Sequence, residues 1–308
     1  MTIRIFIKRL STLVACMALA ACQPPQGACP ESSGVTLQVL GSGGPVADDG
    51  RASSAYLVWI DGRARALIDA GGGSFLRFGE AGARFEDLDF VGLSHLHTDH
   101  SADFPALLKS GSFAARDRPL RVAGPDGDGE FPGLKAFLAA MLARDSGAYA
   151  YLSAFLDGTR NTPMLTPLEI APGETALLWT SDDLVVEGMR VPHGIVPAVA
   201  FRVRAGDATL VFGSDQNGSD PAFTEFAKEA SILVMHMAVP EDVSGVGRRL
   251  HAPPSVIGNV AFEADPGQLV LSHFMARSLA DLAANVSLVR KRYGGEVSVA
   301  DDLACFTP

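Results

Sequence analysis

The segment Ser94-His95-Leu96-His97-Thr98-Asp99-His100 constrains this chain more than any other feature, because it places three imidazoles and a carboxylate within six residues. The chain has only seven histidines in 308 residues, so a polar surface loop would rarely collect three of them. Imidazole and carboxylate groups together suit a divalent first-row metal ion. The spacing lets His95 and His97 point one way while Asp99 and His100 point another, so this one loop can serve two metal ions.

The composition of the chain excludes several classes of protein. Hydrophobic residues make up 47% of the sequence and charged residues only 19%, which excludes intrinsic disorder for the bulk of the chain. The formal net charge is −10, the wrong sign for a protein that follows a phosphate backbone by electrostatic attraction. We therefore expect no nucleic-acid partner. The sequence makes no prediction of oligomeric state.

The first 21 residues have the pattern of a bacterial export signal. Three basic residues precede an apolar run over 10–21, and these are Arg4, Lys8 and Arg9. Twelve residues are too few for a helix that crosses the core of a bilayer, which favours a signal peptide over a membrane span. We therefore expect residues 1–21 to be removed on export.

Two cleavage sites remain open at the end of this signal. Ala18-Leu19-Ala20 fits an ordinary small-x-small site, which would release a soluble periplasmic protein. Leu19-Ala20-Ala21-Cys22 resembles the bacterial lipoprotein box, in which the Cys is lipidated and becomes the first residue. We expect the lipoprotein form, held on a membrane that faces the periplasm by lipid on Cys22, with residues 22–34 as a tether.

The remaining cysteines lie at opposite ends of the exported chain. Cys16 leaves with the signal, so Cys29 and Cys305 are the two that remain besides Cys22. In an oxidising compartment they either form a disulfide that closes a long loop or stay as two separate thiols.

The hydrophobic pattern beyond residue 34 is continuous and indicates one α/β domain over 35–308. Strands are expected at 35–40, 55–60, 65–69, 90–94, 120–123, 184–191, 198–203, 209–212, 232–236, 269–272 and 296–299. Helices are expected after His100 and at 134–143, 148–156, 255–263 and 279–292. Antiparallel strands followed by alternating strands and helices predict sheets covered by helices.

These motifs together resemble a known family. His-x-His-x-Asp-His after a strand, followed by Pro192-His193-Gly194, Gly213-Ser214-Asp215 and Leu271-Ser272-His273-Phe274, is similar to the metallo-β-lactamase superfamily of binuclear hydrolases. Upstream, Gly41-Ser42-Gly43-Gly44-Pro45 and Leu67-Ile68-Asp69-Ala70-Gly71 resemble the opening of its ribonuclease Z-like branch. The resemblance covers nearly the whole exported chain. It implies a four-layer αβ/βα sandwich with the metals at one edge.

The resemblance also implies a ligand set for two divalent ions, most simply zinc, with iron or manganese as alternatives because a His/Asp set is not selective. It assigns His95, His97 and His193 to the first ion. It assigns Asp99, His100 and His273 to the second ion and makes Asp215 the bridge. Asp69 would orient the histidine loop through hydrogen bonds, the alternative being a carboxylate in a turn at a strand end.

Two further histidines stand outside this ligand set. His251 stands where ribonuclease Z-like members place a His that protonates the leaving group, although Pro253 also makes it a residue beside a helix start. His236 ends an apolar strand, which favours a satisfied buried residue. Relatives place a Glu beside that His, whereas this chain has Met237.

The implied chemistry is hydrolysis by a hydroxide that bridges two metal ions, because metal binding lowers the pKa of water to about 7, with Asp99 placed to accept a proton. Relatives that process transfer RNA carry an RNA-grasping arm between the positions of His193 and Asp215, and this chain has only a short interval there. We therefore expect small phosphodiesters or related esters as substrates. Lactones, sulfate esters and β-lactams remain alternatives, as does a non-catalytic, metal-stabilised lipoprotein of the envelope.

The interval between His100 and His193 is long and is expected to supply the wall over the site. Its aromatic candidates are Phe113, Tyr149, Tyr151 and Phe155, each of which also fits a place in the core.

Overall fold

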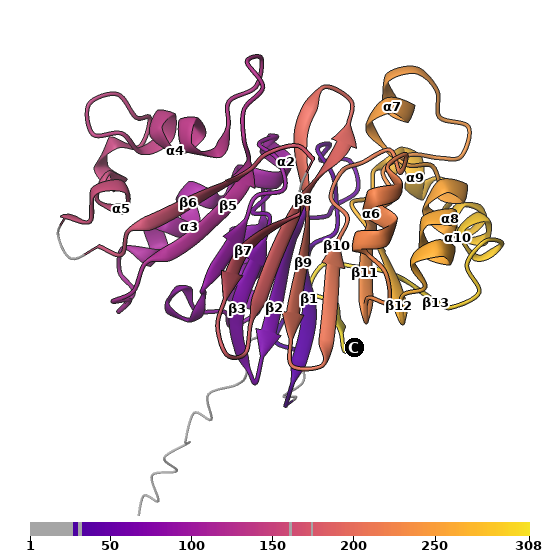
Figure 1. Cartoon of the computed structure of the whole chain (residues 1–308), viewed down its shortest axis with the longest axis horizontal. Coiled ribbons are helices and arrows are strands. Elements are labelled where there is room, and N and C mark those ends of the chain that lie inside the picture. The colour runs from indigo at the N-terminus through magenta and orange to yellow at the C-terminus, as the bar shows by residue number, and fades with distance from the viewer. Residues whose placement is uncertain (1–26, 30–32, 160–161, 174) are drawn as a thin grey trace, which may run out of the picture.

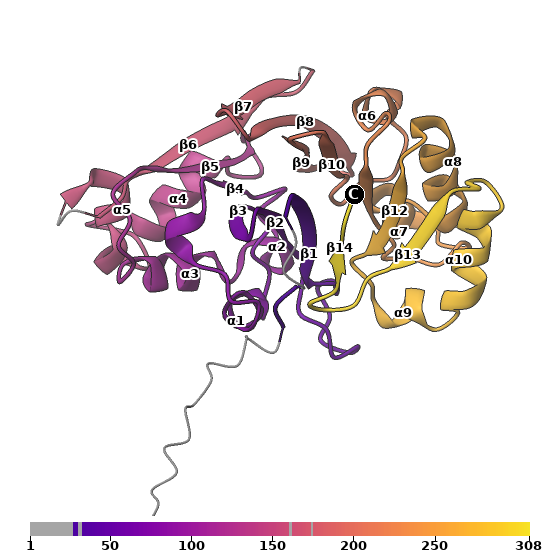
Figure 2. The same cartoon turned by 90° about the horizontal axis from the view of Figure 1, so that it is seen from below.

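The computed structural model describes residues 27–29, 33–159, 162–173 and 175–308. The expected export signal, both expected cleavage sites and Cys22 lie outside these ranges. Within them, two mixed sheets of seven strands each face one another at the centre of the molecule (Figures 1 and 2). Helices cover the outer face of each sheet, α1 and α3 to α5 on one side and α6 and α8 to α10 on the other, whereas α2 and α7 lie at the edge where strands end.

The first sheet begins antiparallel and continues parallel. Its strand order is β14 (Cys305–Phe306), β1 (Val35–Gly41), β2 (Ala55–Ile60), β3 (Arg63–Ile68), β4 (Phe90–Gly92), β5 (Leu120–Pro125) and β6 (Leu165–Ile170). β14 to β3 pair antiparallel, and β3 to β6 pair parallel. Parallel strands need a crossover between them, and α1, α3 and α4 lie in those crossovers.

The second sheet repeats this plan in the other half of the chain. Its order is β13 (Glu296–Val299), β12 (Gln268–Ser272), β11 (Ile232–His236), β10 (Ala208–Phe212), β9 (Val196–Ala205), β8 (Val185–His193) and β7 (Ala176–Thr180). β7 to β10 pair antiparallel, and β10 to β13 pair parallel. The interval between His193 and Asp215 is thus filled by β9 and β10, with no long excursion between these described residues.

The helices are short. Those in the first half of the chain are α1 (Ser74–Glu80), α2 (Thr98–Ser101), α3 (Phe104–Gly111), α4 (Leu134–Leu142) and α5 (Ala154–Asp157), with 3-10 turns η1 (Phe85–Asp87) and η2 (Ala150–Leu152). Those in the second half are α6 (Pro221–Phe226), α7 (Gly245–Leu250), α8 (Pro254–Ala264), α9 (Ala276–Leu279) and α10 (Leu282–Arg290).

Three hydrophobic cores separate the four layers. On β2, Leu57 packs into the core beneath the helices, whereas its neighbours Tyr56 and Val58 belong to the core between the two sheets. This alternation follows from the two-residue period of a strand. A third core lies between the second sheet and its helices, with Leu233 and Ile257 among its members. The four-layer αβ/βα sandwich expected from the sequence is confirmed.

Several elements differ from the expectation. The helix expected at 148–156 is divided into η2 and α5, and the helix expected at 279–292 is divided at Asp281, whose backbone is not helical. β6 was not predicted because Pro167 interrupts its strand pattern. The short helices α1, α6 and α7 span two turns or less, which is too little for an apolar period to be recognised.

The two terminal segments of the described chain are joined. Cys29 and Cys305 form a disulfide, so the alternative of two free thiols is wrong. The bond ties the segment before β1 to β14, which pairs with β1 at the edge of the first sheet. No helix among the described residues has the length and apolar character needed to cross a membrane.

Candidate metal centre

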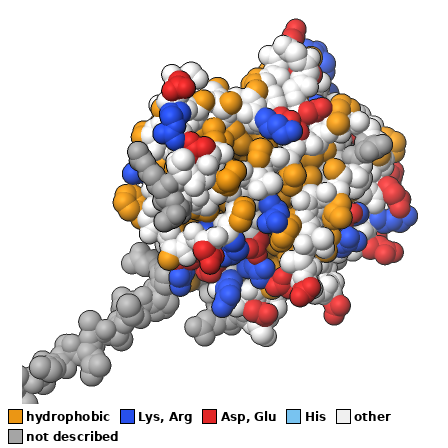
Figure 3. Space-filling view, turned by 60° about the vertical axis from the view of Figure 1, so that its left-hand side comes forward, with side chains coloured by type: hydrophobic (Ala, Val, Ile, Leu, Met, Phe, Trp, Pro, Cys, Tyr) orange, Lys and Arg blue, Asp and Glu red, His pale blue; other side chains and the backbone are white. Residues whose placement is uncertain are grey.

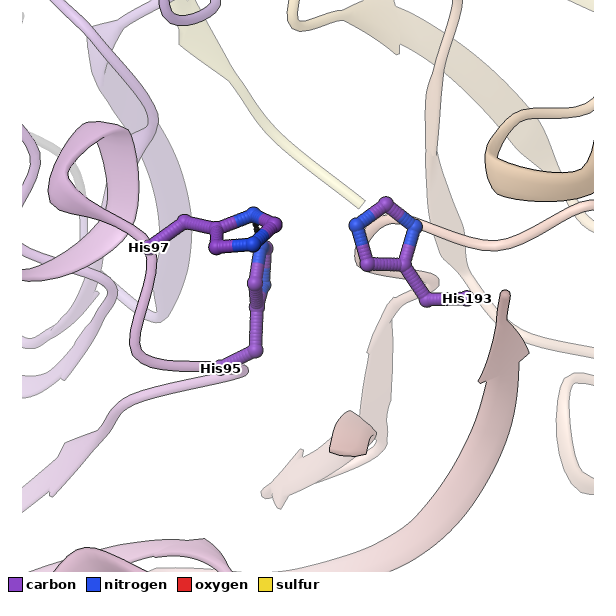
Figure 4. A group of neighbouring side chains, drawn as sticks. All are labelled: His95, His97 and His193. Atoms are coloured by element: carbon purple, nitrogen blue, oxygen red, sulfur yellow. Dashed lines mark hydrogen bonds between the residues drawn. The ribbon is translucent and has the colours of Figure 1, made fainter. Parts of the chain in front are cut away.

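The histidine loop lies at one edge of the sandwich, where the ends of strands from both sheets meet. The loop follows β4 in the first sheet, while His193 ends β8 and His273 follows β12 in the second. Figure 4 shows His95 and His97 on the loop and His193 across from them, with the three rings facing one another. Residues that are far apart in the sequence are thereby brought together at one cleft.

The first ligand group comprises His95, His97 and His193, whose ligand atoms all lie within 4.8 Å of one another. His95 and His193 are buried, and His97 is nearer the surface. His193 donates its Nδ1–H to the carbonyl oxygen of Leu250 at 2.9 Å, so its Nε2 carries the lone pair. That buried Nε2 has no hydrogen-bond partner among the described residues. An orphaned imidazole lone pair aimed at two other imidazoles fits a metal ion.

The second group comprises Asp99, His100, Asp215 and His273, all buried, with ligand atoms again within 4.8 Å of one another. Nε2 of His100 and Nε2 of His273 lie 3.1 Å apart. Asp99 Oδ2 lies 3.2 Å from the same His273 nitrogen. Two imidazole nitrogens and a carboxylate that converge on one point have the chemistry of a cation site.

Asp215 lies between the two groups. Its Oδ2 is 3.6 Å from His193 Nε2 on one side and 3.8 Å from His100 Nε2 on the other. Its Oδ1 is 3.4 Å from His273 Nε2. One carboxylate therefore faces both ligand groups, which is the position that a bridging ligand needs.

Asp69 holds the histidine loop from behind. Its Oδ1 accepts from the Ser94 backbone N–H at 2.7 Å, and its Oδ2 accepts from the Ser94 hydroxyl at 2.9 Å and from His100 Nδ1 at 2.7 Å. Asp69 itself has φ of 62°, a left-handed conformation that Asp tolerates better than most residues. Because His100 uses Nδ1 for this hydrogen bond, Nε2 is the ring nitrogen left to face the site.

His236 plays the corresponding part for Asp215. Its Nδ1 donates to Asp215 Oδ1 at 2.7 Å, which leaves Nε2 to accept from the Tyr56 hydroxyl at 2.9 Å. The Tyr56 hydroxyl also lies 3.0 Å from Ser272 Oγ. His236 is thus a buried, satisfied residue, as expected. The parts of Tyr56 and Ser272 were not predicted, because no local pattern shows that β2 and β12 meet at His236.

Burial and charge set the protonation states in the site. Burial lowers the pKa of His236 to about 3 and that of His251 to about 4, so both rings are neutral at pH 7. Burial alone would raise the pKa of Asp215, but the nearby charge of His273 and the hydrogen bond from His236 lower it well below its usual value. Neutral imidazoles beside ionised carboxylates are what a divalent ion requires.

His100 and His273 differ from these two rings. Burial opposes the protonation of His100, but the charges of Asp69 and Asp99 outweigh burial and raise its pKa well above the usual value. The charge of Asp215 and the hydrogen bond with Asp99 likewise outweigh burial and raise the pKa of His273. A metal ion bound at His100 Nε2 would therefore have to displace a proton from that ring.

His251 caps the C-terminus of α7 and is buried beside the two ligand groups. Its Nδ1 lies 3.7 Å from Asp215 Oδ1 and has no hydrogen-bond partner among the described residues. With His193 and Asp215 it forms a third group whose ligand atoms lie within 4.8 Å of one another. The structure thus places His251 at the site, where it faces the carboxylate that the two main groups share.

A cleft of about 530 Å³ opens over the site. Besides the histidines and carboxylates, its lining includes Pro45, Leu96, Leu250, Met275 and Arg277. The expected aromatic wall is wrong, since none of the four aromatic candidates is among the cleft residues that the structure describes. Phe155 packs in the core beneath the helices, whereas Phe113, Tyr149 and Tyr151 are exposed. Their segments cover the outer face of the first sheet rather than its edge.

Comparison with known proteins identifies relatives of this chain. Residues 48–199 match the family model described as the metallo-beta-lactamase superfamily. A ribonuclease Z of Mycobacterium marinum is 28% identical over 282 residues, which cover 87% of this chain and 97% of that protein. A ribonuclease Z of Methanosarcina mazei is 27% identical over 297 residues, covering 86% of this chain and 95% of that protein.

Two solved structures share the fold. The metallo-beta-lactamase fold protein YhfI from Bacillus subtilis superposes with a TM-score of 0.68 at 22% identity, covering 89% of this chain and 99% of that one. The short form of human tRNase Z superposes with a TM-score of 0.68 at 20% identity, covering 88% of this chain and 98% of that one.

These relatives correct one expectation. The expectation of small-molecule ester substrates with no nucleic acid is wrong, because the relatives that match almost the full chain are named ribonuclease Z. That expectation rested partly on net charge, which is a sum over the whole chain and carries no information on the local field at a cleft. It also rested on the short interval between His193 and Asp215, which shows only that no arm is inserted at that place. At this cleft, Arg277 is part of the lining and Arg248 and Arg249 directly precede the lining residues Leu250 and His251.

Proposed function

This chain carries a domain of the metallo-beta-lactamase superfamily, and we propose that it is a metal-dependent hydrolase that cleaves phosphodiester bonds in RNA. The observation that carries the proposal is the position of Asp215, which faces both ligand groups within one cleft. The substrate class is supported by the ribonuclease Z relatives, which match this chain over nearly their full length.

The ligand groups fit two divalent ions. His95, His97 and His193 would hold one ion, and Asp99, His100 and His273 the other, with Asp215 shared. Zinc is the proposed metal, and iron or manganese also suits the His/Asp set. When bound, such ions polarise a phosphoryl oxygen and supply a nucleophile at neutral pH.

The protein's own groups prepare the site for this reaction. Asp69 accepts a hydrogen bond from His100, and His236 donates one to Asp215, so both residues are held in place and little reorganisation is needed when substrate binds. Arg277, whose Nε donates to the Ala238 carbonyl oxygen at 2.9 Å, lines the cleft and presents a positive charge to an anionic substrate.

Proton transfer is assigned to two residues. The Asp99 carboxylate lies at the cleft and accepts a proton from the attacking water. His251 gives a proton to the departing oxygen. Its pKa of about 4 is low for this task, but the negative charge of a bound phosphate favours the protonated ring and raises that pKa.

We also propose that residues 1–21 direct export and that Cys22 carries lipid, so that the hydrolase domain over 35–308 acts outside the cytoplasm on a membrane. The support is the order of basic, apolar and small residues before Cys22. Cys29–Cys305 agrees with an oxidising compartment, because disulfides persist there and are rare in the cytosol.

The test is a substrate panel for the purified full chain loaded with zinc. Labelled single-stranded RNA and an RNA hairpin with a 3′ extension are compared with a bis-aryl phosphate, an aryl sulfate, a lactone and a cephalosporin. We expect cleavage of RNA and of the bis-aryl phosphate. Intact RNA together with rapid opening of the lactone or the cephalosporin would refute the proposed substrate class.

A pair of aspartate variants ties the activity to the site. Asp215→Asn should lower RNA cleavage by about a thousandfold or more, because it weakens a shared ligand. Asp220→Asn is the matched control, since Asp220 caps α6 with its side chain and lies outside the ligand groups. Equal loss in both variants would show a general effect on folding and not a role of Asp215 in the reaction.

A further inference from the structure

An apolar surface lies over α1 and α3. A groove of about 740 Å³ runs between these helices and η1, and its lining includes Phe75, Leu76 and Phe113. The exposed fractions of these side chains are 39%, 64% and 79%. Arg84 and Glu86 also line the groove, and they pair with each other through a short hydrogen bond. Large exposed apolar side chains that line one groove favour a binding surface.

The surface continues from Phe113 toward η2. The Lys109 ammonium lies over the Phe113 ring at 4.7 Å and near the Tyr151 ring at 5.6 Å. Tyr151 is 61% exposed, and its ring centroid lies 6.3 Å from that of Tyr149. Figure 3, in which the left-hand side of Figure 1 comes forward, shows hydrophobic side chains among basic and acidic ones on that face. We call these residues the α1–α3 surface: Phe75, Leu76, Lys109, Phe113, Tyr149 and Tyr151.

The composition of the α1–α3 surface is that of a membrane interface. Tyr and Phe are favoured where an apolar layer meets water, because their rings are apolar and the Tyr hydroxyl stays hydrated. A Lys among them adds attraction to anionic headgroups.

The place where the chain after Cys22 meets the body of the protein also favours a bilayer as the partner of this surface. The Gly27 N–H donates to the Glu80 carbonyl oxygen at 3.1 Å, so the chain reaches the body of the protein at the end of α1. The Gly27 carbonyl oxygen accepts from Gln38 Nε2 at 2.6 Å, which holds this segment on β1. Cys22 precedes Gly27 by five residues, and five residues span at most about 18 Å. A lipid on Cys22 therefore enters a bilayer within a short distance of Phe75 and Leu76.

We propose that the α1–α3 surface lies on the bilayer into which the Cys22 lipid is inserted, with Leu76 and Phe113 at the level of the acyl-chain boundary and Lys109 at the headgroups. The proposal rests on the proposed lipidation of Cys22 and is independent of the hydrolase activity. The surface and the lipid would act as two attachments, which orients the protein on the membrane as well as retaining it.

Tryptophan fluorescence in vesicles tests the contact directly. The lipidated full chain is reconstituted into vesicles of phosphatidylethanolamine and phosphatidylglycerol that contain brominated lipid, which quenches a nearby indole. Phe113→Trp is compared with Phe262→Trp, a matched control because Phe262 is 66% exposed on α8, which covers the other sheet. We expect the emission added by Phe113→Trp to be quenched and that added by Phe262→Trp to be unchanged. Equal quenching of both, or of neither, overturns the proposal.

A transfer measurement gives the size of the effect. Transfer of the lipidated protein from donor to acceptor vesicles should be about tenfold faster in Leu76→Asp and in Phe113→Asp, because one buried apolar side chain corresponds to about a tenfold change in partitioning. Phe262→Asp should transfer at the wild-type rate. Equal rates in all variants contradict a role for the α1–α3 surface.

Other outcomes also decide the proposal. If the protein is a dimer in detergent and Phe113→Asp makes it a monomer, a second copy covers the surface and the membrane proposal is wrong. If wild-type protein is found to carry no lipid on Cys22, the proposed lipidation and the membrane proposal are both wrong. Measuring RNA cleavage by the same Leu76 and Phe113 variants tests the proposed function separately from the membrane contact, because these residues lie outside the metal cleft.

Discussion

Asp69→Asn tests how the structure prepares one half of the metal centre. The substitution preserves size and keeps one oxygen for the Ser94 backbone N–H, but it can replace the oxygen that faces His100 Nδ1 with an amide that donates. Two donors then face each other in a fully buried place. His100 relieves the conflict by turning away or by moving its proton to Nε2, and both changes remove the lone pair that points into the site.

The magnitude follows from the bonds that are lost. Losing the partner that orients a metal-bound His weakens metal affinity by about 10- to 100-fold, which corresponds to about 1.4–2.8 kcal/mol. The loss should fall on one ion only. The group of Asp99, His100 and His273 depends on Asp69, whereas Nδ1 of His193 in the other group is held by the Leu250 carbonyl oxygen. Losing a buried hydrogen bond should also lower the free energy of unfolding by about 1–3 kcal/mol.

Competitive titration of zinc against a chromophoric chelator measures both affinities. We expect one affinity to fall in Asp69→Asn and the other to stay within about twofold of wild type. Asp89→Asn is the control, because Asp89 is also buried but is bound by Arg65 and Arg118 away from the site. It should lower stability and leave both zinc affinities unchanged. Two unchanged affinities in a folded Asp69→Asn protein would refute the reasoning.

Three further predictions concern proton donation, the disulfide and acid stability. His251→Ala should slow the cleavage of substrates with poor leaving groups by up to about a hundredfold, while the cleavage of activated aryl phosphates and the metal content stay unchanged. Loss of metal would make His251 a ligand instead. Replacing Cys29 and Cys305 by Ser should lower the free energy of unfolding, measured in denaturant, by up to about 5 kcal/mol. An unchanged denaturant concentration at the midpoint of unfolding would contradict this. With chelator present, the free energy of unfolding should fall as pH drops from about 6.5 toward 3. In the folded protein His236 and His251 have pKa values of about 3 and about 4, so between about pH 6.5 and those values the unfolded chain binds more protons than the folded one. His236→Gln should flatten that pH profile, and an unaltered profile would count against this cause.

The ligand positions could be predicted because their chemistry is local. Three imidazoles and a carboxylate in one short segment indicate metal binding without knowledge of the fold, and the family resemblance adds His193, Asp215 and His273 from strand ends. The structure brings these residues into two groups at one cleft.

The supporting contacts could not be predicted, because they depend on how the two sheets meet. Tyr56 and His236 are 180 positions apart and join only where β2 faces β11 across the central core. No period in either strand shows that the Tyr56 hydroxyl would find a buried imidazole. The same reason explains the wrong aromatic wall, since the exposure of Phe113 depends on which layer α3 covers.

Net charge was the weakest guide to function. A value of −10 describes the field far from the protein, whereas substrate binding depends on groups at the cleft such as Arg277 and the proposed metal ions. The predicted absence of a nucleic-acid partner failed for this reason.

The number of metal ions in the purified protein tests the central claim most directly. Elemental analysis of the wild-type chain should find about two divalent ions per molecule, because Asp215 joins two complete ligand groups. The same protein, stripped by chelator and returned to zinc, should recover about two ions together with RNA cleavage. A folded protein that contains no metal and takes up none from excess zinc would contradict the account.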